Sequence, residues 1–184
     1  MINEYVCKPT GKVSLIFHKN GRFNSDVGSI VGGEIINTIG DCNSILPDSS
    51  MILANRMANK NVHIDHIEIY YKDNEESTEE SANSPLIVHF DASISDEPYA
   101  IDYDGDKCNI ESEELESING VYLIKGLAFC ATTDSLPPSC VITKLNLCAV
   151  DENNKCVRFS EKTNISAWSL PPDVLVTVLW KITF

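Results

Sequence analysis

Apolar residues recur mainly at every second position along this chain, which is the spacing of a β-strand with one buried face. The clearest run is 174–184, where Thr177, Lys181 and Thr183 fall on the face opposite the apolar residues. A second run, 85–94, begins at Pro85 and alternates in the same way. Both runs predict strands. The apolar residues of the first run are Val174, Val176, Val178, Trp180, Ile182 and Phe184.

Further segments rich in Val, Ile, Phe and Tyr are predicted as strands, with turn-forming residues between them. Asn20-Gly21 predicts a tight hairpin at 19–22, because both residues readily adopt positive φ angles. The segments 133–139 and 151–155 are predicted as turns. Residues 49–59 are ambiguous, since a serine at 49 or 50 could cap a short helix there. The additional strand segments are 12–18, 28–39, 62–71, 120–131, 141–150 and 156–159.

Short strands separated by turns, without alternating helices, predict an all-β fold. We expect one domain over residues 1–184, an antiparallel jelly-roll or Greek-key sandwich or barrel of about eight to ten strands. Two acidic insert loops, about 73–84 and 95–119, interrupt the strands and contain too little apolar surface to pack by themselves.

Charge is distributed unevenly along the 184 residues, whose formal net charge is −13. The region 61–118 holds 17 acidic residues, with Lys72 and Lys107 as its only bases. Direct nucleic-acid binding is not expected there, because it depends on Lys and Arg at the phosphates. An acidic surface favours basic proteins or cations, or simply keeps a protein soluble. A transmembrane segment is not expected either, since no run of 18 or more apolar residues is present.

Seven cysteines occur without a C-x-x-C pair, so the sequence lacks the usual spacing of a zinc site. Several lie in apolar runs, as Cys130 does, where a thiol behaves as a small buried hydrophobe. We therefore expect reduced thiols in an intracellular protein, and the N-terminus has no signal-peptide pattern. Disulfides among Cys140, Cys148 and Cys156 are the alternative if the protein leaves the cell.

One acidic segment has oxygen ligands at the spacing of a calcium-binding loop. Lys107 stands at the position where that loop needs glycine, so an acidic solvent-exposed loop is the alternative. Calcium is the cofactor that this segment suggests. The candidate ligands, at loop positions 1, 3, 5 and 12, are Asp102, Asp104, Asp106 and Glu113.

Histidines and acids also cluster in 63–68. On a regular strand His63 and His66 point to opposite faces and therefore cannot share a metal ion. One of them could bind a metal together with His89 from a neighbouring strand, and the alternative is ordinary polar pairing across the strands.

Catalytic motifs are not apparent. The sequence has neither the G-x-S-x-G nucleophile turn nor a phosphate-binding loop, and the glycines of 28–33 favour a bulge or bend in a strand. We therefore expect that the protein is not an enzyme.

Two segments carry a resemblance to a protein family. Residues 53–69 and 120–129 look like the paired barrel strands of viral jelly-roll structural proteins, with the nimavirus major envelope β-barrel proteins nearest. The resemblance covers roughly half the chain and implies a β-barrel building block of a virus particle.

A second resemblance is to the nucleoplasmin core, in the order and type of the segments 13–16, 66–69 and 85–88. It implies an acidic, oligomeric jelly-roll that acts as a chaperone for basic proteins.

The sequence thus predicts a structural protein, a jelly-roll subunit of a virus particle that is part of the capsid, the tegument or an envelope-associated layer. It would assemble with itself or with other virion proteins through strand edges and outer sheet faces, with 174–184 as the candidate edge strand. The alternatives are an acidic protein-binding module and a viral accessory protein that binds a host factor. In the acidic module the contacts with basic partners would include Glu75, Glu76, Glu79 and Glu80.

Overall fold

The fold is all-β, as the computed structural model shows for residues 10–24, 29–73, 85–90, 99–101, 107–108, 126–163, 165 and 169–183. Within these residues twelve strands and one helix are present. They are β1 (Thr10–Lys19), β2 (Arg22–Asn24), β3 (Ser29–Val31), β4 (Glu34–Ile45), α1 (Ser49–Met57), β5 (His63–Lys72), β6 (Leu86–His89), β7 (Tyr99–Ile101), β8 (Lys107–Cys108), β9 (Gly126–Thr133), β10 (Val141–Val150), β11 (Cys156–Thr163) and β12 (Val174–Thr183).

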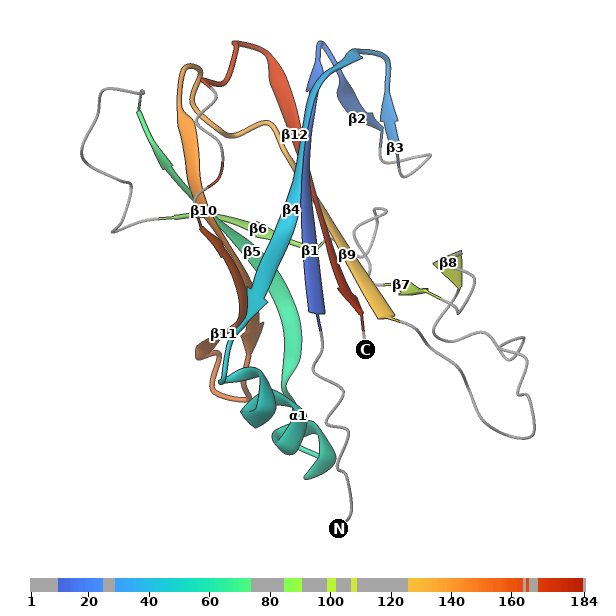
Figure 1. Cartoon of the computed structure of the whole chain (residues 1–184), viewed down its shortest axis with the longest axis vertical. Helices are drawn as coiled ribbons and strands as arrows, with labels where there is room; N and C mark the ends of the chain where they lie inside the picture. The colour runs from blue at the N-terminus through green and yellow to red at the C-terminus, as the bar shows by residue number, and fades with distance from the viewer. Residues whose placement is uncertain are drawn as a thin grey trace.

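Ten of these strands form one sheet in the order β6-β5-β10-β11-β4-β1-β12-β9-β7-β8, with every described pair antiparallel. The sheet curls around a single apolar core (Figure 1). It nearly closes, because Phe90, directly after β6, lies against Phe129 of β9 with ring centroids 5.7 Å apart. The chain passes from β9 to β10 across the sheet, as in a Greek key. The predicted antiparallel sandwich or barrel is confirmed.

Strand β12 lies inside the sheet, paired with β1 on one side and β9 on the other. Its alternating apolar residues point into the core, where Trp180 and Val176 are fully buried. The strand itself was predicted correctly, but its assignment as an edge strand for association is wrong. The reason is that both of its hydrogen-bonding edges are occupied within the chain. The buried residues concerned are Val174, Val176, Val178, Trp180 and Ile182, while Phe184 lies outside the described residues.

The predicted hairpin at 19–22 is also wrong. Asn20 does adopt a positive φ of 55°, but β1 pairs with β4, and β2 pairs with β3. Lys19 pairs with Glu34 and Arg22 with Val31, so β1–β2 and β3–β4 are the two arms of one long hairpin with an interruption in each arm.

Two glycines cause the interruption in the second arm. Gly32 and Gly33 have φ angles of 69° and 77°, and they divide the predicted strand 28–39 into β3 and the start of β4. A Cβ on Gly33 would lie 2.5 Å from the Gly21 nitrogen, so the two arms approach each other more closely there than any side chain permits. The sequence-based interpretation of these glycines as a bend is thus correct.

The ambiguous stretch at 49–59 forms the helix α1, which lies beside β11 (Figure 1). The helix begins after Asp48, and neither of the two serines caps it; Ser50 donates its hydroxyl to the Pro47 carbonyl oxygen instead. Ile52 is buried in the core, whereas Met57 is 90% exposed.

The helix of the described part of the chain is too short to cross a membrane. The acidic segments at 74–84 and 102–106, which include the predicted calcium ligands Asp102, Asp104 and Asp106, lie outside the described residues, and so does Glu113. The same holds for the predicted contact residues Glu75, Glu76, Glu79 and Glu80. These interpretations therefore stay predictions.

Candidate metal centre

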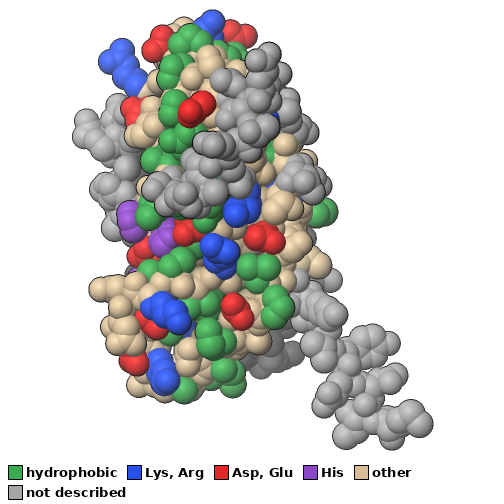
Figure 2. Space-filling model, turned by 90° about the vertical axis from the view of Figure 1, so that its left-hand side faces the viewer, with side chains coloured by type: hydrophobic (Ala, Val, Ile, Leu, Met, Phe, Trp, Pro, Cys, Tyr) green, Lys and Arg blue, Asp and Glu red, His purple; other side chains and the backbone are tan. Residues whose placement is uncertain are grey.

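A polar cluster lies on the face of strands β5, β10 and β11 that points away from the core. Along β10, Leu145, Leu147 and Ala149 enter the core, so Asn146 and Cys148 between them are on the opposite face. Both are nevertheless fully buried, because the neighbouring side chains cover them. Histidine side chains lie beside acidic ones at mid-height on this side of the molecule (Figure 2).

Four side chains of this cluster have the chemistry of metal ligands. His66 and Glu68 come from β5, Cys148 from β10 and Cys156 from β11. One nitrogen, oxygen or sulfur atom of each lies within 4.8 Å of those of the other three. Strand pairing explains why these side chains lie together. Cys148 is directly opposite His66 in the β5–β10 pair. Cys156, at the start of β11, lies near Cys148 because β10 and β11 form a hairpin.

A β-bulge positions the histidine. Cys148 pairs with His66 and the next residue of β10 pairs with Ile64, so Asp65 is an extra residue in β5. Because of the bulge, the regular alternation that would place His63 and His66 on opposite faces is broken between them. That the two histidines cannot share a metal ion stays a prediction. Both contact the Asp65 carboxylate, His66 through Nδ1 at 2.8 Å and His63 through Nε2 at 3.6 Å.

His89 does lie on the strand next to His66, as both the metal-binding and the polar-pairing interpretations require. His89 of β6 pairs with His66, and their ring centroids are 5.3 Å apart. The His89 Nδ1 lies 3.0 Å from the same Asp65 oxygen that accepts from His66. Burial alone would raise the pKa of Asp65, but the hydrogen bond from His66 and the charge of His89 outweigh it and lower the pKa.

The Asp65 carboxylate holds the His66 ring in one orientation. With Nδ1 held by the carboxylate, Nε2 is the nitrogen left to bind a metal ion, the arrangement in which a carboxylate commonly supports a ligating histidine. The His66 side chain is 6% exposed, so solvent screens this contact only weakly.

Glu68 is oriented in a similar way. Its Oε2 accepts hydrogen bonds from the Tyr70 hydroxyl at 3.0 Å and from Asn146 Nδ2 at 2.8 Å, and Arg158 Nε lies 4.0 Å from it. Burial would raise the pKa of Glu68, but these hydrogen bonds lower it, so the carboxylate is charged. Its other oxygen, Oε1, lies 3.9 Å from the Cys156 sulfur and is available to a metal ion.

The two thiols are close to each other and to Glu68. Burial and the charge of Glu68 raise the pKa of Cys148 well above its usual range, and burial also raises that of Cys156. Without a cation both groups are therefore neutral thiols. Cys140, Cys148 and Cys156 are free cysteines in the structure, and the reduced state of the thiols in the cell stays a prediction.

One buried atom of the cluster lacks a partner within the described part of the chain. The Oδ1 of Asn146 accepts no hydrogen bond there, although the residue is fully buried and its Nδ2 donates to Glu68. Such an atom is costly to bury, and a cation or a metal-bound group beside it would offset that cost.

Sequence reasoning found part of this site. It singled out His66 and His89 but treated the cysteines as core residues or disulfide partners. The missed signal is that Cys148 and Cys156 flank the turn at 151–155, so a hairpin across that turn brings them together. That β5 lies next to β10, and so supplies His66 and Glu68, depends on the tertiary fold.

Comparisons with known proteins find no matching family model, no matching curated protein and no matching solved structure. The resemblances to nimavirus envelope proteins and to the nucleoplasmin core therefore gain no support from relatives.

Proposed function

We propose that this protein is a non-enzymatic β-barrel that binds one zinc ion on the outer face of its sheet, through His66, Glu68, Cys148 and Cys156. The observation that carries the proposal is the convergence of these four ligand atoms from three strands within 4.8 Å of one another. Nitrogen, thiolate sulfur and carboxylate oxygen are the ligands that zinc takes in proteins.

One distance between two of the ligand atoms is close to that of a tetrahedral site. With zinc–ligand bonds of about 2.0–2.3 Å, atoms on one tetrahedral ion lie about 3.3–3.8 Å apart. The 3.9 Å between Cys156 Sγ and Glu68 Oε1 would need to shorten by only a few tenths of an ångström. Pairs at the 4.8 Å limit of the group would have to approach by about 1.0–1.5 Å, through rotation of the side chains.

The charges also balance. Two thiolates and one carboxylate carry three negative charges, of which Zn²⁺ neutralises two. Arg158, beside Glu68 and half exposed, offsets the third. Without the metal, both thiols are protonated, so Glu68 carries the only negative charge of the four ligands.

Four protein ligands favour a structural role for the ion. A catalytic zinc keeps a position for water or substrate, whereas a structural zinc has all four positions filled by the protein. Here the ion would connect β5, β10 and β11 across the outer face of the sheet. A virion subunit that assembles with itself or with other proteins stays a prediction, with no described contact that favours it.

Cobalt(II) titration tests the proposal, because cobalt replaces zinc and reports its ligands by absorption. The full chain, reduced and freed of metal, should bind one equivalent and show thiolate-to-cobalt charge transfer with the intense visible bands of a tetrahedral site. Cys148→Ser and Cys156→Ser should each weaken the charge-transfer band, whereas Cys42→Ser, an exposed cysteine on β4 outside the four-ligand group, should not.

Thermal unfolding of each metal-free variant shows whether it is folded. A folded wild-type chain without a cobalt–thiolate band would overturn the proposal. Unchanged bands in both Cys148→Ser and Cys156→Ser would do the same.

A further inference from the structure

Cys148 and Cys156 lie beside each other on neighbouring strands of the outer face. Their sulfur atoms are within 4.8 Å, and a hydrogen bond joins the two thiols. Because a disulfide bond is about 2.0 Å long, the sulfurs would have to approach by at most about 2.8 Å. A change of rotamer moves a cysteine sulfur by about this distance.

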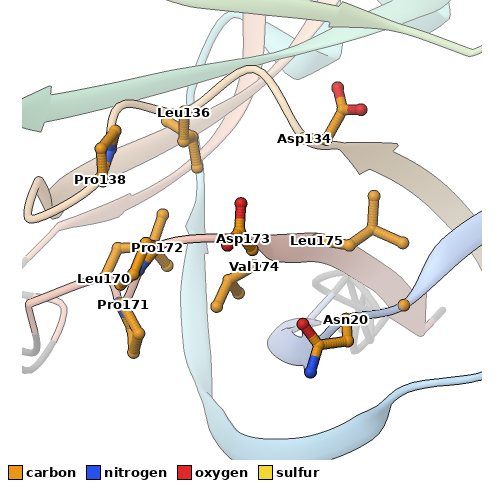
Figure 3. Close-up of a pocket in the computed structure, with 11 residues that line it drawn as sticks. Asn20, Asp134, Leu136, Pro138, Leu170, Pro171, Pro172, Asp173, Val174 and Leu175 are labelled. Atoms are coloured by element: carbon orange, nitrogen blue, oxygen red, sulfur yellow. The ribbon is translucent and has the colours of Figure 1, made fainter.

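Cys140, the third buried or hairpin cysteine of this region, is not a partner for either. It lies eight residues before Cys148 along β10, about 25 Å away in an extended strand. Leu170 N donates to the Cys140 carbonyl at 2.9 Å, and Leu170 lines the hollow at that end of the barrel (Figure 3). A disulfide in this part of the sheet would therefore join Cys148 and Cys156.

The hairpin places the two cysteines diagonally across the β10–β11 pair. Cys148 pairs with Arg158, and Cys156 pairs with Val150. Diagonal neighbours lie about 7–8 Å apart, whereas the Cα atoms that a disulfide joins are usually about 4.4–6.8 Å apart. The strands must therefore close by roughly 1 Å, and the resulting disulfide would be easily reduced.

The start of β11 has room for this movement. In the part of the chain that the structure describes, β11 pairs with β4 only at Ser160 and Glu161. Residues 156–158 are paired with β10 alone and directly follow the turn at 151–155. A shift of these residues toward β10 breaks no described strand pairing.

Solvent reaches one of the two thiols. Cys156 is exposed, whereas Cys148 is 0% exposed beneath its neighbours. An oxidant in solution therefore meets Cys156 first. Cys148 then lies next to the modified sulfur as a resolving thiol.

We propose that Cys148 and Cys156 are a site of reversible oxidative modification, at which a small-molecule disulfide such as glutathione disulfide converts the two thiols into a disulfide. First, the Cys156 sulfur bonds to one glutathione sulfur, the bond between the glutathione sulfurs breaks, and one glutathione leaves as a thiol with the Cys156 proton. Next, the Cys148 sulfur bonds to the Cys156 sulfur, and the second glutathione leaves with the Cys148 proton. Two cysteine sulfurs are oxidised and two glutathione sulfurs are reduced.

The consequence for zinc rests on the proposed function, whereas the disulfide itself does not. If the two thiols are zinc ligands, the disulfide removes two of the four, and the oxidised chain should not bind the ion. Oxidation and zinc binding would then exclude each other.

Trypsin cleavage provides the test, because it separates the two cysteines. Cleavage after Lys144, Lys155 and Arg158 places Cys148 in peptide 145–155 and Cys156 in peptide 156–158. The full chain, reduced and metal-free, is equilibrated with glutathione disulfide for hours, since protonated thiols exchange slowly. Remaining thiols are alkylated, and the digest is analysed by mass spectrometry without reduction. The two peptides should be joined, and excess reduced glutathione should separate them.

Three variants test the order of the steps. Cys148→Ser should leave Cys156 bonded to glutathione, whereas Cys156→Ser should leave Cys148 unmodified because it is buried. Cys42→Ser, which removes an exposed cysteine outside the four-ligand group, should still give the joined peptides. In the wild type, the cobalt–thiolate band should be lost on oxidation and return on reduction.

The proposal is overturned if the two peptides stay separate in a folded chain with excess oxidant, or if either sulfur bonds to another cysteine instead. Equal modification of Cys148 in Cys156→Ser and of Cys156 in Cys148→Ser would overturn the order of the steps. Joined peptides from a chain whose reduced form shows no cobalt–thiolate band would support the disulfide and overturn the zinc site alone.

Discussion

Replacing Asp65 by Asn should weaken metal binding without changing the ligands, because Asp65 orients the ligating ring of His66. The bulge at position 65 places the carboxylate oxygen 2.8 Å from His66 Nδ1, within the range of a charge-assisted hydrogen bond. The same oxygen contacts His89 at 3.0 Å. At these distances Asp65 would act as a positioning residue for His66.

The expected loss of metal affinity depends on which of the three histidine contacts of Asp65 is shielded from solvent. The His89 and His63 side chains are 66% and 52% exposed, and ion pairs at such exposure contribute little. His66 is 6% exposed, so its contact carries most of the effect. Loss of a carboxylate that supports a ligating histidine typically costs about 10–100-fold in metal affinity, or about 1.4–2.7 kcal/mol.

The assay is competition between the protein and a chromophoric chelator for zinc, combined with cobalt spectra. Asp65→Asn should bind zinc about 10–100-fold more weakly, while its cobalt complex at saturation keeps the wild-type bands. His89→Ala and His63→Ala should each change the affinity by less than about threefold, because the contacts they remove are exposed. His18→Ala, on β1, serves as the control for loss of a histidine.

Unchanged zinc affinity in folded Asp65→Asn would refute the positioning role. If His89→Ala lost as much zinc affinity as Asp65→Asn, the exposed contact of His89 would matter as much as the buried contact of His66, contrary to this prediction.

Three further predictions concern protons, the interrupted hairpin and the central strand. Zinc binding at pH 7 should release about two protons per ion, one from each thiol, so affinity rises with pH; calorimetry in buffers of different ionisation enthalpy measures this release. In urea denaturation, Gly33→Ala should lower the free energy of unfolding by at least about 2 kcal/mol, because φ is positive at this position and the added Cβ would clash with Gly21. Gly32→Ala also has a positive φ but open space around it, so it should lower the free energy of unfolding by about 1 kcal/mol. Trp180→Ala should lower the free energy of unfolding by about 3–5 kcal/mol in the same assay, whereas Ile87→Ala, on the exposed side of β6, should lower it by less than about 0.5 kcal/mol. Equal losses for the two glycine variants, or for Trp180→Ala and Ile87→Ala, would contradict the fold as described.

The strands could be predicted from the sequence because their alternation is local. The period-two pattern located β1, β5, β10 and β12 to within two residues at the ends that the structure describes. It could not show that β12 is a central strand, because an apolar strand in the middle of a sheet and one at its edge have the same alternation. That difference depends on which strands pair, and pairing joins residues as far apart as Thr10 and Thr183.

The candidate site was harder to predict for the same reason. A single extra residue, Asp65, shifts the alternation of β5 and brings two histidines to one carboxylate. No pattern in the sequence marks a bulge of this kind. Cys148 and Cys156 could have been paired from the turn between them, but their neighbours on β5 are about 80 residues away in the sequence.

The central claim is that His66, Glu68, Cys148 and Cys156 bind one zinc ion. The most direct test is a crystal structure of the zinc-loaded protein with anomalous diffraction recorded on both sides of the zinc absorption edge. One zinc peak per chain is expected, bonded to the two sulfurs, to His66 Nε2 and to Glu68 Oε1. Density for all four side chains without a zinc peak between them, or a peak bound by other residues, would contradict it.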